Sequence, residues 1–153
     1  MTGISELPEL KIKKLRKTAK MPFRATKGAA AHDLFAALSS GVTIPPGEVL
    51  AVPTGIAVEL PSEEYVALIF LRSGLGLKHG IGMINSVGVI DSDYRGEIIV
   101  SLINHSGKPF DINPGDRLAQ MMITKTYLLP ITEVSELSDT ERGSGGFGST
   151  GKS

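Results

Sequence analysis

The sequence of 153 residues contains no cysteine. Its absence excludes a disulfide framework, a thiolate nucleophile and a cysteine-ligated zinc site. No apolar run reaches the roughly 18 residues of a membrane span, and the first residues lack the apolar core of a signal peptide. The formal net charge is zero, so the surface as a whole does not attract nucleic acid or an anionic membrane. We therefore expect a cytoplasmic protein that binds neither.

Aromatic residues are also scarce, at 5% with no tryptophan, whereas glycine is frequent at 18 residues. This combination indicates short strands joined by tight turns. The hydrophobic fraction of 41% is ordinary for a globular protein, and the length predicts one domain that can bury a core.

Strand signals dominate the chain, and helical periodicity is nearly absent. Turn signals recur between the apolar runs, at 45–47, 106–107 and 113–115. Residues 73–80 could form one or two helical turns at most. This punctuation predicts an all-β fold, either a sandwich, a barrel or a jelly roll. The expected strands lie within 10–15, 48–61, 64–71, 96–104 and 117–129.

The composition changes near residue 135, where apolar residues become rare and glycine frequent. We predict a β domain over 1–134 and a flexible tail over 135–153, because such a tail cannot bury enough surface to order itself. A disordered terminus is the simplest interpretation. Against it, Phe147 stands alone among glycines, Arg142 opens the segment, and the hydroxyls of Ser149 and Thr150 beside glycine N–H groups suit phosphate oxygens.

The residues Gly146–Ser153, GFGSTGKS, match the phosphate-binding loop pattern G-x-x-x-x-G-K-[ST]. That loop needs a strand before it and a helix after it, whose N-terminus holds the phosphate. Here a flexible run precedes the motif and no helical segment follows in the sequence. We therefore expect no P-loop fold, although the glycines still allow backbone N–H groups to approach an anion.

Two polar segments are candidates for binding phosphate and metal. Asp33 lies among small and apolar residues, where it is either a turn aspartate or a carboxylate that holds a hydrated Mg²⁺. Arg72 follows an apolar run, where it either marks a surface turn or clamps a phosphate. In the second case the Ser73 hydroxyl and the Gly74 N–H would add donors.

Two further segments are candidates for water activation and sugar binding. Asp91 and Asp93 flank a serine, and a carboxylate there could orient a water and accept its proton. Tyr94 could offer its ring to a sugar, although an aspartate-rich hairpin with a turn at 94–96 explains the same residues. Gln120 lies inside an apolar strand, so its amide is either satisfied in the core or holds a water.

Together these five segments, in this order, resemble the trimeric dUTP diphosphatase (dUTPase) family from about Leu10 to Gly151. They read AAAHDLFA, RSGLGLKHGI, GVIDSDYRGEI, GDRLAQMMI and RGSGGFGSTG. The resemblance implies a distorted jelly roll or β-clip-like barrel that forms a homotrimer with an exchanged C-terminal arm. It also implies hydrolysis of dUTP to dUMP and pyrophosphate with Mg²⁺, which limits uracil incorporation into DNA and supplies dUMP for thymidylate synthesis. Each active site would draw on all three subunits.

The resemblance also assigns roles to individual residues. Asp91 would position the attacking water, with Gln120 as a second catalytic group, and Asp33 would hold the metal through water. Tyr94 would pack under the deoxyribose and exclude a 2′-hydroxyl, a hairpin around Asn85–Ile90 would read uracil by backbone hydrogen bonds, and Phe147 would stack on the base. The implied substrate contacts are Arg72, Ser73, Gly74, Asn85, Gly88, Val89, Ile90, Tyr94, Arg142, Gly146, Phe147, Gly148, Ser149 and Thr150.

Two alternatives differ from this interpretation. The dCTP deaminases resemble dUTPases in fold but carry a glutamate five residues after the glycine of the third motif, where this chain has Ser101. A dUTPase-like binding module without catalysis is the other alternative. The presence of Asp91, Tyr94 and Gln120 together with the tail favours an enzyme. His32, Leu71 and Gly76 depart from the common family pattern without removing a catalytic group.

Overall fold

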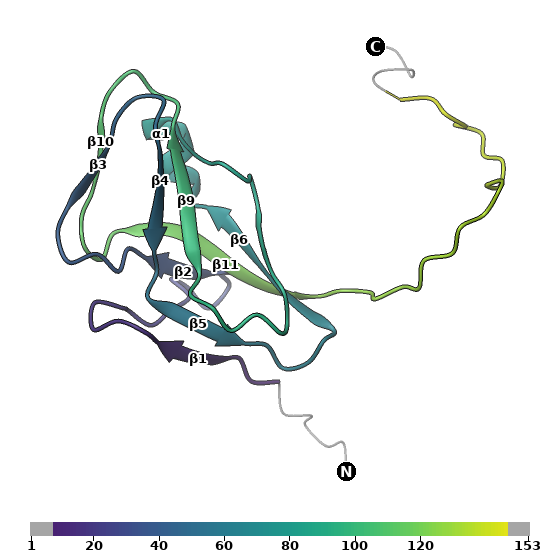
Figure 1. The fold of residues 1–153 in the computed structure, drawn as a ribbon, viewed down its shortest axis with the longest axis horizontal. Coiled ribbons are helices and arrows are strands. Elements are labelled where there is room, and N and C mark those ends of the chain that lie inside the picture. The colour runs from purple at the N-terminus through teal and green to yellow at the C-terminus, as the bar shows by residue number, and fades with distance from the viewer. Residues whose placement is uncertain (1–7, 147–153) are drawn as a thin grey trace.

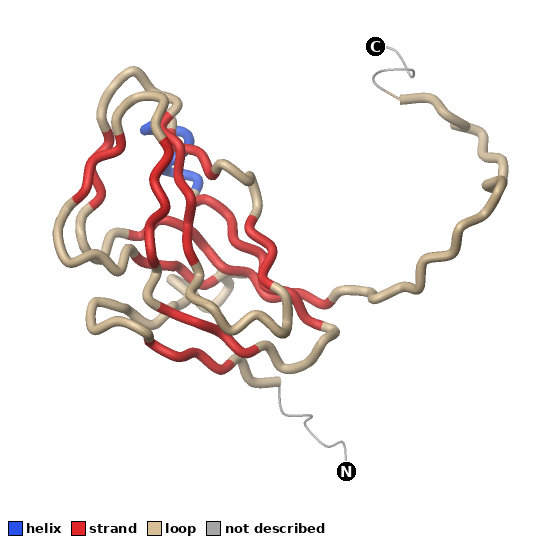
Figure 2. The backbone as a smooth tube through the Cα atoms, viewed as in Figure 1, coloured by secondary structure: helices blue, strands red, loops and turns tan. Residues whose placement is uncertain are grey.

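The computed structural model describes residues 8–146, and within them the chain forms eleven β-strands and one short helix (Figures 1 and 2). The all-β prediction is confirmed. The elements are β1 (Lys11–Lys14), β2 (His32–Phe35), β3 (Val42–Ile44), β4 (Val49–Pro53), β5 (Ile56–Glu59), β6 (Tyr65–Leu71), α1 (Ser73–His79), β7 (Ile81–Met83), β8 (Gly88–Ile90), β9 (Ile99–Asn104), β10 (Phe110–Ile112) and β11 (Arg117–Lys125).

The strands form four antiparallel sheets, two of which are single pairs. The largest has the order β2–β11–β6–β8, and the second has the order β4–β9–β7. The pairs are β1–β5 and β3–β10, which lie at different ends of the domain in Figure 1. Strand β11 is interior to the largest sheet, so it connects β2 near the start of the chain with β6 in its middle.

The core lies between these sheets and consists almost entirely of aliphatic side chains. Each strand that contributes to it supplies one to three buried hydrophobic residues. This packing fixes the ends of the strands, from which the polar residues discussed below project. The fully buried side chains include Leu34, Ile44, Val52, Ile69, Val100, Leu102, Ile112, Leu118 and Met121.

The expected apolar runs all contain strands, but two of them are shorter than predicted. The strand expected from Gly96 begins at Ile99, and the strand expected to reach Leu129 ends at Lys125. The expected helical turns are present as α1, which ends at Gly80 with a left-handed φ of 66°. The sequence did not reveal β2, β3 or β10, because strands of three or four residues are too short to display a period of two.

The prediction of a hairpin around Asn85–Ile90 is wrong, because the two strands on either side of this turn do not pair with each other. Strands β7 and β8 flank this turn, but β7 pairs with β9 and β8 pairs with β6. The turn therefore connects two different sheets. Ser86 at its centre has a φ of 58°, and its N–H donates to the Met83 carbonyl at 3.0 Å.

Beyond Lys125 the chain leaves the domain as an extended arm over 126–146, which reaches into solvent (Figure 1). The predicted domain boundary at 134/135 falls within this arm. Several large apolar side chains on the arm are exposed: Tyr127 (87%), Leu128 (66%), Leu129 (76%), Ile131 (99%), Val134 (55%) and Leu137 (87%). The one helix within residues 8–146 is too short to cross a membrane.

An ion pair ties the N-terminal segment to the loop before β9. The Arg16 guanidinium donates to both carboxylate oxygens of Glu97, at 2.7 and 2.8 Å, and the Gly55 N–H donates to the same carboxylate at 2.8 Å. The hydrogen bonds from Arg16 outweigh partial burial and hold the pKa of Glu97 below its ordinary value, with the Gly55 N–H acting in the same direction.

This lowered pKa predicts a specific dependence of stability on pH. Because the folded state favours ionised Glu97, the pair stabilises the protein above the unfolded-state pKa of about 4.3 and loses this effect as pH falls through the lower folded pKa. We expect Glu97→Gln to be less stable than wild type at pH 7, with the difference shrinking below about pH 4. Urea unfolding at fixed protein concentration measures this. A difference that stays constant across the pH range contradicts the assignment.

Candidate active site

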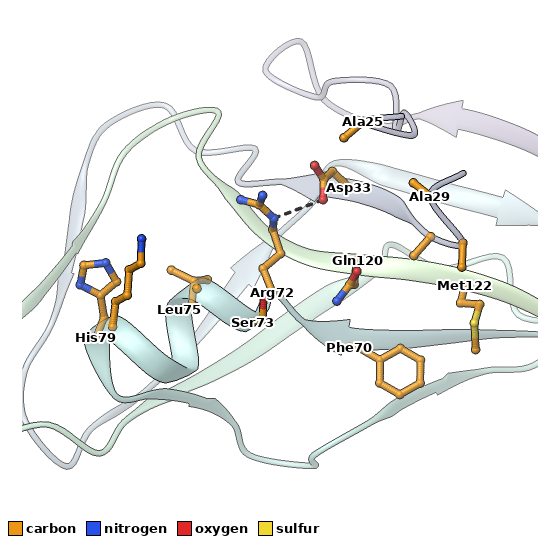
Figure 3. A pocket seen from close by; sticks show the side chains of 14 residues that line it. Ala25, Ala29, Asp33, Phe70, Arg72, Ser73, Leu75, His79, Gln120 and Met122 are labelled. Atoms are coloured by element: carbon orange, nitrogen blue, oxygen red, sulfur yellow. Dashed lines mark ion pairs between the residues drawn. The ribbon is translucent and has the colours of Figure 1, made fainter. Parts of the chain in front are cut away.

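A cleft of about 820 Å³ opens beside the carboxyl end of β6, where the chain turns into α1 (Figure 3). Four parts of the chain surround it: the loop before β2, the end of β6, the helix α1 and the middle of β11. Its lining residues are Ala25, Ala29, Ala30, Ala31, Asp33, Phe70, Arg72, Ser73, Gly74, Leu75, Lys78, His79, Gln120 and Met122.

Strand pairing brings Asp33 and Gln120 together in this cleft. On β11, Gln120 is the register partner of Asp33 on β2 and of Phe70 on β6. Directly opposed residues of neighbouring strands project on the same face of a sheet. Two polar residues 87 positions apart in the sequence therefore share one surface.

Asp33 is held between two arginines. Its carboxylate lies 3.2 Å from Arg72 Nε, which follows β6, and 3.1 Å from Arg117 Nη1 at the start of β11. Asp33 is 9% exposed, so this carboxylate depends on charged partners. One carboxylate balances one of these two guanidinium groups, and Lys78 also lines the cleft, so the cleft and its border carry net positive charge. This charge balance suits an anionic ligand.

A β-bulge directs Arg117 to this position. In a regular strand, residues 117 and 120 would project on opposite faces, because side chains alternate. The pairing of β11 with β2 shifts register between Arg117 and Ala119, so Arg117 opposes Phe35 while Gln120 opposes Asp33. The extra residue places Arg117 and Gln120 on the same face. Simple alternation in the sequence therefore could not identify Arg117 as a partner of Asp33.

Gln120 has a fixed orientation. Its Nε2 donates to the Leu71 carbonyl at 3.2 Å, which leaves the side-chain oxygen free to accept a hydrogen bond within the cleft. Arg72 precedes α1 with an extended backbone, and Ser73 and Gly74 form the first turn of the helix. Backbone N–H groups in a first helical turn have no partner within the helix. This corner therefore offers a guanidinium, a hydroxyl and backbone donors.

The other predicted site residues lie elsewhere in the chain. Val89, Ile90, Asp91 and Tyr94 line a separate pocket of about 210 Å³, together with Glu97 and Ile99. None of them lines the cleft of Figure 3. Asn85 is in the turn before β8, and Gly88 is the first residue of that strand. The described chain thus holds two groups of predicted site residues that it does not bring together.

The predicted tail residues form a third group. Arg142 and Gly146 lie on the exposed arm, where Arg142 Nε donates to the Gly145 carbonyl at 2.9 Å. Neither lines the cleft or the smaller pocket. Phe147, Gly148, Ser149 and Thr150 lie outside the described residues.

Removing Arg117 should weaken anion binding in the cleft. In Arg117→Met, Asp33 neutralises Arg72, and the positive charge at the cleft is reduced to that of Lys78. We expect affinity for inorganic pyrophosphate to fall about tenfold and unfolding free energy to fall by about 1–3 kcal/mol, because buried Asp33 loses a charged partner. Titration calorimetry and urea unfolding measure the two effects. Lys125→Met on the same strand is the matched control, and equal affinities of the two variants would contradict the role of Arg117.

Comparison with known proteins identifies the family of this chain. The family model for dUTPase matches residues 17–151. The chain is 48% identical over 137 residues to a deoxyuridine 5'-triphosphate nucleotidohydrolase of Desulfitobacterium hafniense, covering 90% of this chain and 91% of that protein. It is also 48% identical over 143 residues to the protein of the same name from Neisseria meningitidis, covering 94% and 95%.

Solved structures give the same result. A mutant of the Staphylococcus bacteriophage 80alpha dUTPase with dUpNHpp superposes with a TM-score of 0.87 at 29% identity, covering 95% of this chain and all of that one. A variant dUTPase from phage phi11 of S. aureus, described with a structural Mg(II) ion, gives a TM-score of 0.76 at 28% identity, covering 84% and 97%. With nearly its whole length matched in sequence and in fold, the chain belongs to the dUTPase family.

Proposed function

We propose that this chain hydrolyses dUTP to dUMP and pyrophosphate at sites assembled from three copies of itself. Its family membership makes it a dUTP diphosphatase. The observation that supports a shared site is the separation of its polar residues: Arg72 and Gln120 line one cleft, and Asp91 and Tyr94 line a different pocket. Contact between neighbouring subunits would unite them.

In this proposal the cleft binds the triphosphate. Arg72, Ser73 and Gly74 donate to phosphate oxygens from one corner, and the guanidinium charge balances part of the phosphate charge. Asp33 and Gln120 present oxygen atoms to the same space, which is the ligand chemistry that Mg²⁺ prefers, and a Mg²⁺ site commonly uses one carboxylate together with waters and phosphates. Asp33 would therefore hold the ion through water, and the bound ion would neutralise charge on the phosphate oxygens.

The nucleoside would bind along β8. This strand is at the edge of its sheet, so one row of its backbone N–H and C=O groups has no ladder partner among the described strands. Gly88, Val89 and Ile90 can thus offer backbone hydrogen bonds to the uracil edge, with Asn85 in the preceding turn. Cytosine has the opposite pattern of donors and acceptors there, and a mismatch that leaves buried groups unpaired is strongly disfavoured.

Chemistry would take place at the α-phosphorus. The oxygen of a water forms the new bond to phosphorus, the bond from that phosphorus to the oxygen bridging to the β-phosphate breaks, and Asp91 accepts the proton of the water. Gln120 would hold the water and phosphate network through its free side-chain oxygen. Tyr94 would pack under the deoxyribose and leave no room for a 2′-hydroxyl.

The arm would carry the tail to a neighbouring subunit. Its exposed apolar residues, Tyr127 to Leu137, have no cover within the described chain, and an apolar segment of this kind suits docking on another surface. The following residues, Arg142, Gly146, Phe147, Gly148, Ser149 and Thr150, would then close over the neighbour's triphosphate and base. The proposed setting is the cytoplasm, and the absence of nucleic-acid and membrane partners stays a prediction from the sequence.

Asp91→Asn should abolish turnover while it preserves substrate binding. The amide cannot accept the proton of the water, so we expect kcat to fall by about 10²–10⁴-fold. Pyrophosphate release measures turnover, and titration with a non-hydrolysable dUTP analogue measures affinity. Asp93→Asn, two residues away in the same turn, is the matched control and should remain active. Turnover of Asp91→Asn at the wild-type rate would remove Asp91 from the mechanism.

A mixing experiment tests the shared site. One preparation carries Asp91→Asn with an intact tail, and the other ends after Glu141 with Asp91 intact. Each is expected to be inactive alone, and subunit exchange between them should restore part of the activity because some sites then combine an intact Asp91 with an intact tail. As a control, the Asp91→Asn chain is mixed with a chain that carries both changes. No recovery after demonstrated exchange argues against sites shared between subunits.

A further inference from the structure

Arg16 makes the most complete ion pair in the described chain, yet it lies outside both groups of predicted site residues. Its guanidinium binds the Glu97 carboxylate with two hydrogen bonds, at 2.7 and 2.8 Å, across 81 positions of sequence. The Glu97 side chain is 17% exposed and also accepts from the Gly55 N–H at 2.8 Å. Glu97 is therefore fixed to two separate parts of the domain.

The backbone of Glu97 supports Tyr94. The phenol hydroxyl of Tyr94 donates to the Glu97 carbonyl at 3.1 Å. The ring lies directly over Gly96, where a Cβ would collide with the phenol oxygen, so the ring can hold this position only because residue 96 is glycine. Tyr94 and Glu97 also line the same small pocket as Asp91. The position of the Tyr94 ring thus follows the position of residues 96 and 97.

Residues 91–97 belong to no strand, since β8 ends at Ile90 and β9 begins at Ile99. Apart from a backbone hydrogen bond from the Tyr94 N–H to the Asp91 carbonyl at 3.1 Å, contacts of side chains therefore hold this loop in place. Arg95 stabilises the loop internally, because its Nη1 donates to the carbonyls of Ser92 at 2.7 Å and Tyr94 at 3.2 Å. Its Nε lies 4.0 Å from a carboxylate oxygen of Glu59 on β5. Arg16 and Gly55 instead connect the loop to the rest of the domain.

We propose that Arg16 is a positioning residue for Tyr94, acting through Glu97, and that it thereby sharpens the preference of the enzyme for deoxyribose over ribose. The inference rests on the proposed function, in which the Tyr94 ring packs under the deoxyribose. The Tyr94 ring excludes a 2′-hydroxyl only if the ring is held in place and cannot move away from the sugar. Without Arg16 the Glu97 carboxylate loses its charged partner, residues 96 and 97 gain freedom, and the ring can retreat to admit a ribonucleotide.

The test is the ratio of kcat/KM for UTP to kcat/KM for dUTP, measured by pyrophosphate release. We expect Arg16→Ala to raise this ratio roughly three- to tenfold. Arg16→Lys, which keeps the charge but not the two-pronged geometry, should give an intermediate ratio. Glu97→Gln should raise the ratio as Arg16→Ala does, and it provides a second measurement if Arg16→Ala does not fold.

A matched control is available on the same side of the domain. Lys11 pairs with Glu59 between β1 and β5 at 2.5 Å, and its side chain is 66% exposed. Lys11→Ala removes this exposed ion pair. Its partner Glu59 approaches residues 91–97 only at Arg95, 4.0 Å away, and within the described residues neither Lys11 nor Glu59 makes a hydrogen bond to that loop, so the UTP-to-dUTP ratio should equal that of wild type. A general loss of stability would affect both substrates alike and leave the ratio unchanged.

Tyr94→Ala separates failure of this inference from failure of the proposed function. If Tyr94→Ala raises the ratio and the folded Arg16 and Glu97 variants do not, the positioning role of Arg16 is overturned. The proposed role of Tyr94 in excluding a 2′-hydroxyl is then retained. If Tyr94→Ala leaves the ratio unchanged, the proposed role of Tyr94 is itself wrong. A rise in all three variants, with Lys11→Ala unchanged, supports the inference.

Discussion

The pairing of β11 along both of its edges is the constraint on which the cleft depends. One edge is bonded to β2 and the other to β6, so a single strand fixes the relative positions of Asp33, Gln120 and the chain that leads into Arg72. The residues of β11 that face the core, Leu118, Ala119 and Met121, are fully buried, which ties this register to the packing of the whole domain. Slippage by one residue would turn Gln120 into the core and expose Met121. The hydrophobic core thus maintains the geometry of the polar site.

The same fold prevents one chain from completing the proposed site. The cleft is at the end of β6 beside α1, whereas Asp91 and Tyr94 follow β8 at the edge of the sheet. The first group projects from strands and from the start of α1, and the second lies in a loop that Arg16 and Gly55 tie to the domain, so movement within the domain is a costly way to bring them together. Association of several copies of the chain can bring the two groups together without any rearrangement inside the domain. The division of polar residues and the exposed arm therefore have a common explanation in the proposed trimer.

Sequence reasoning reached the fold class and the polar residues but not their distribution in space. Asp33, Arg72 and Gln120 were found because charged or amide groups are conspicuous beside apolar strands and glycine turns. Arg117 was missed because a bulge, which alternation cannot reveal, brings it to the face of Asp33. The pairing of β7 and β8 was predicted wrongly because a short turn normally joins partners, while here the buried faces of two sheets compete for the flanking strands. Long-range pairing decided both cases.

The order of folding and assembly follows from the position of the arm. Every strand of the domain is complete before residue 126, so the core can form while the remaining residues are still emerging from the ribosome. The arm is synthesised after every strand of the domain and meets a domain that is already closed, so its apolar residues remain available to another molecule. A single cut by a protease in this exposed segment would detach Arg142 and all that follows without opening the core. Such a molecule would keep every strand of the domain and yet lack the tail residues of the proposed site.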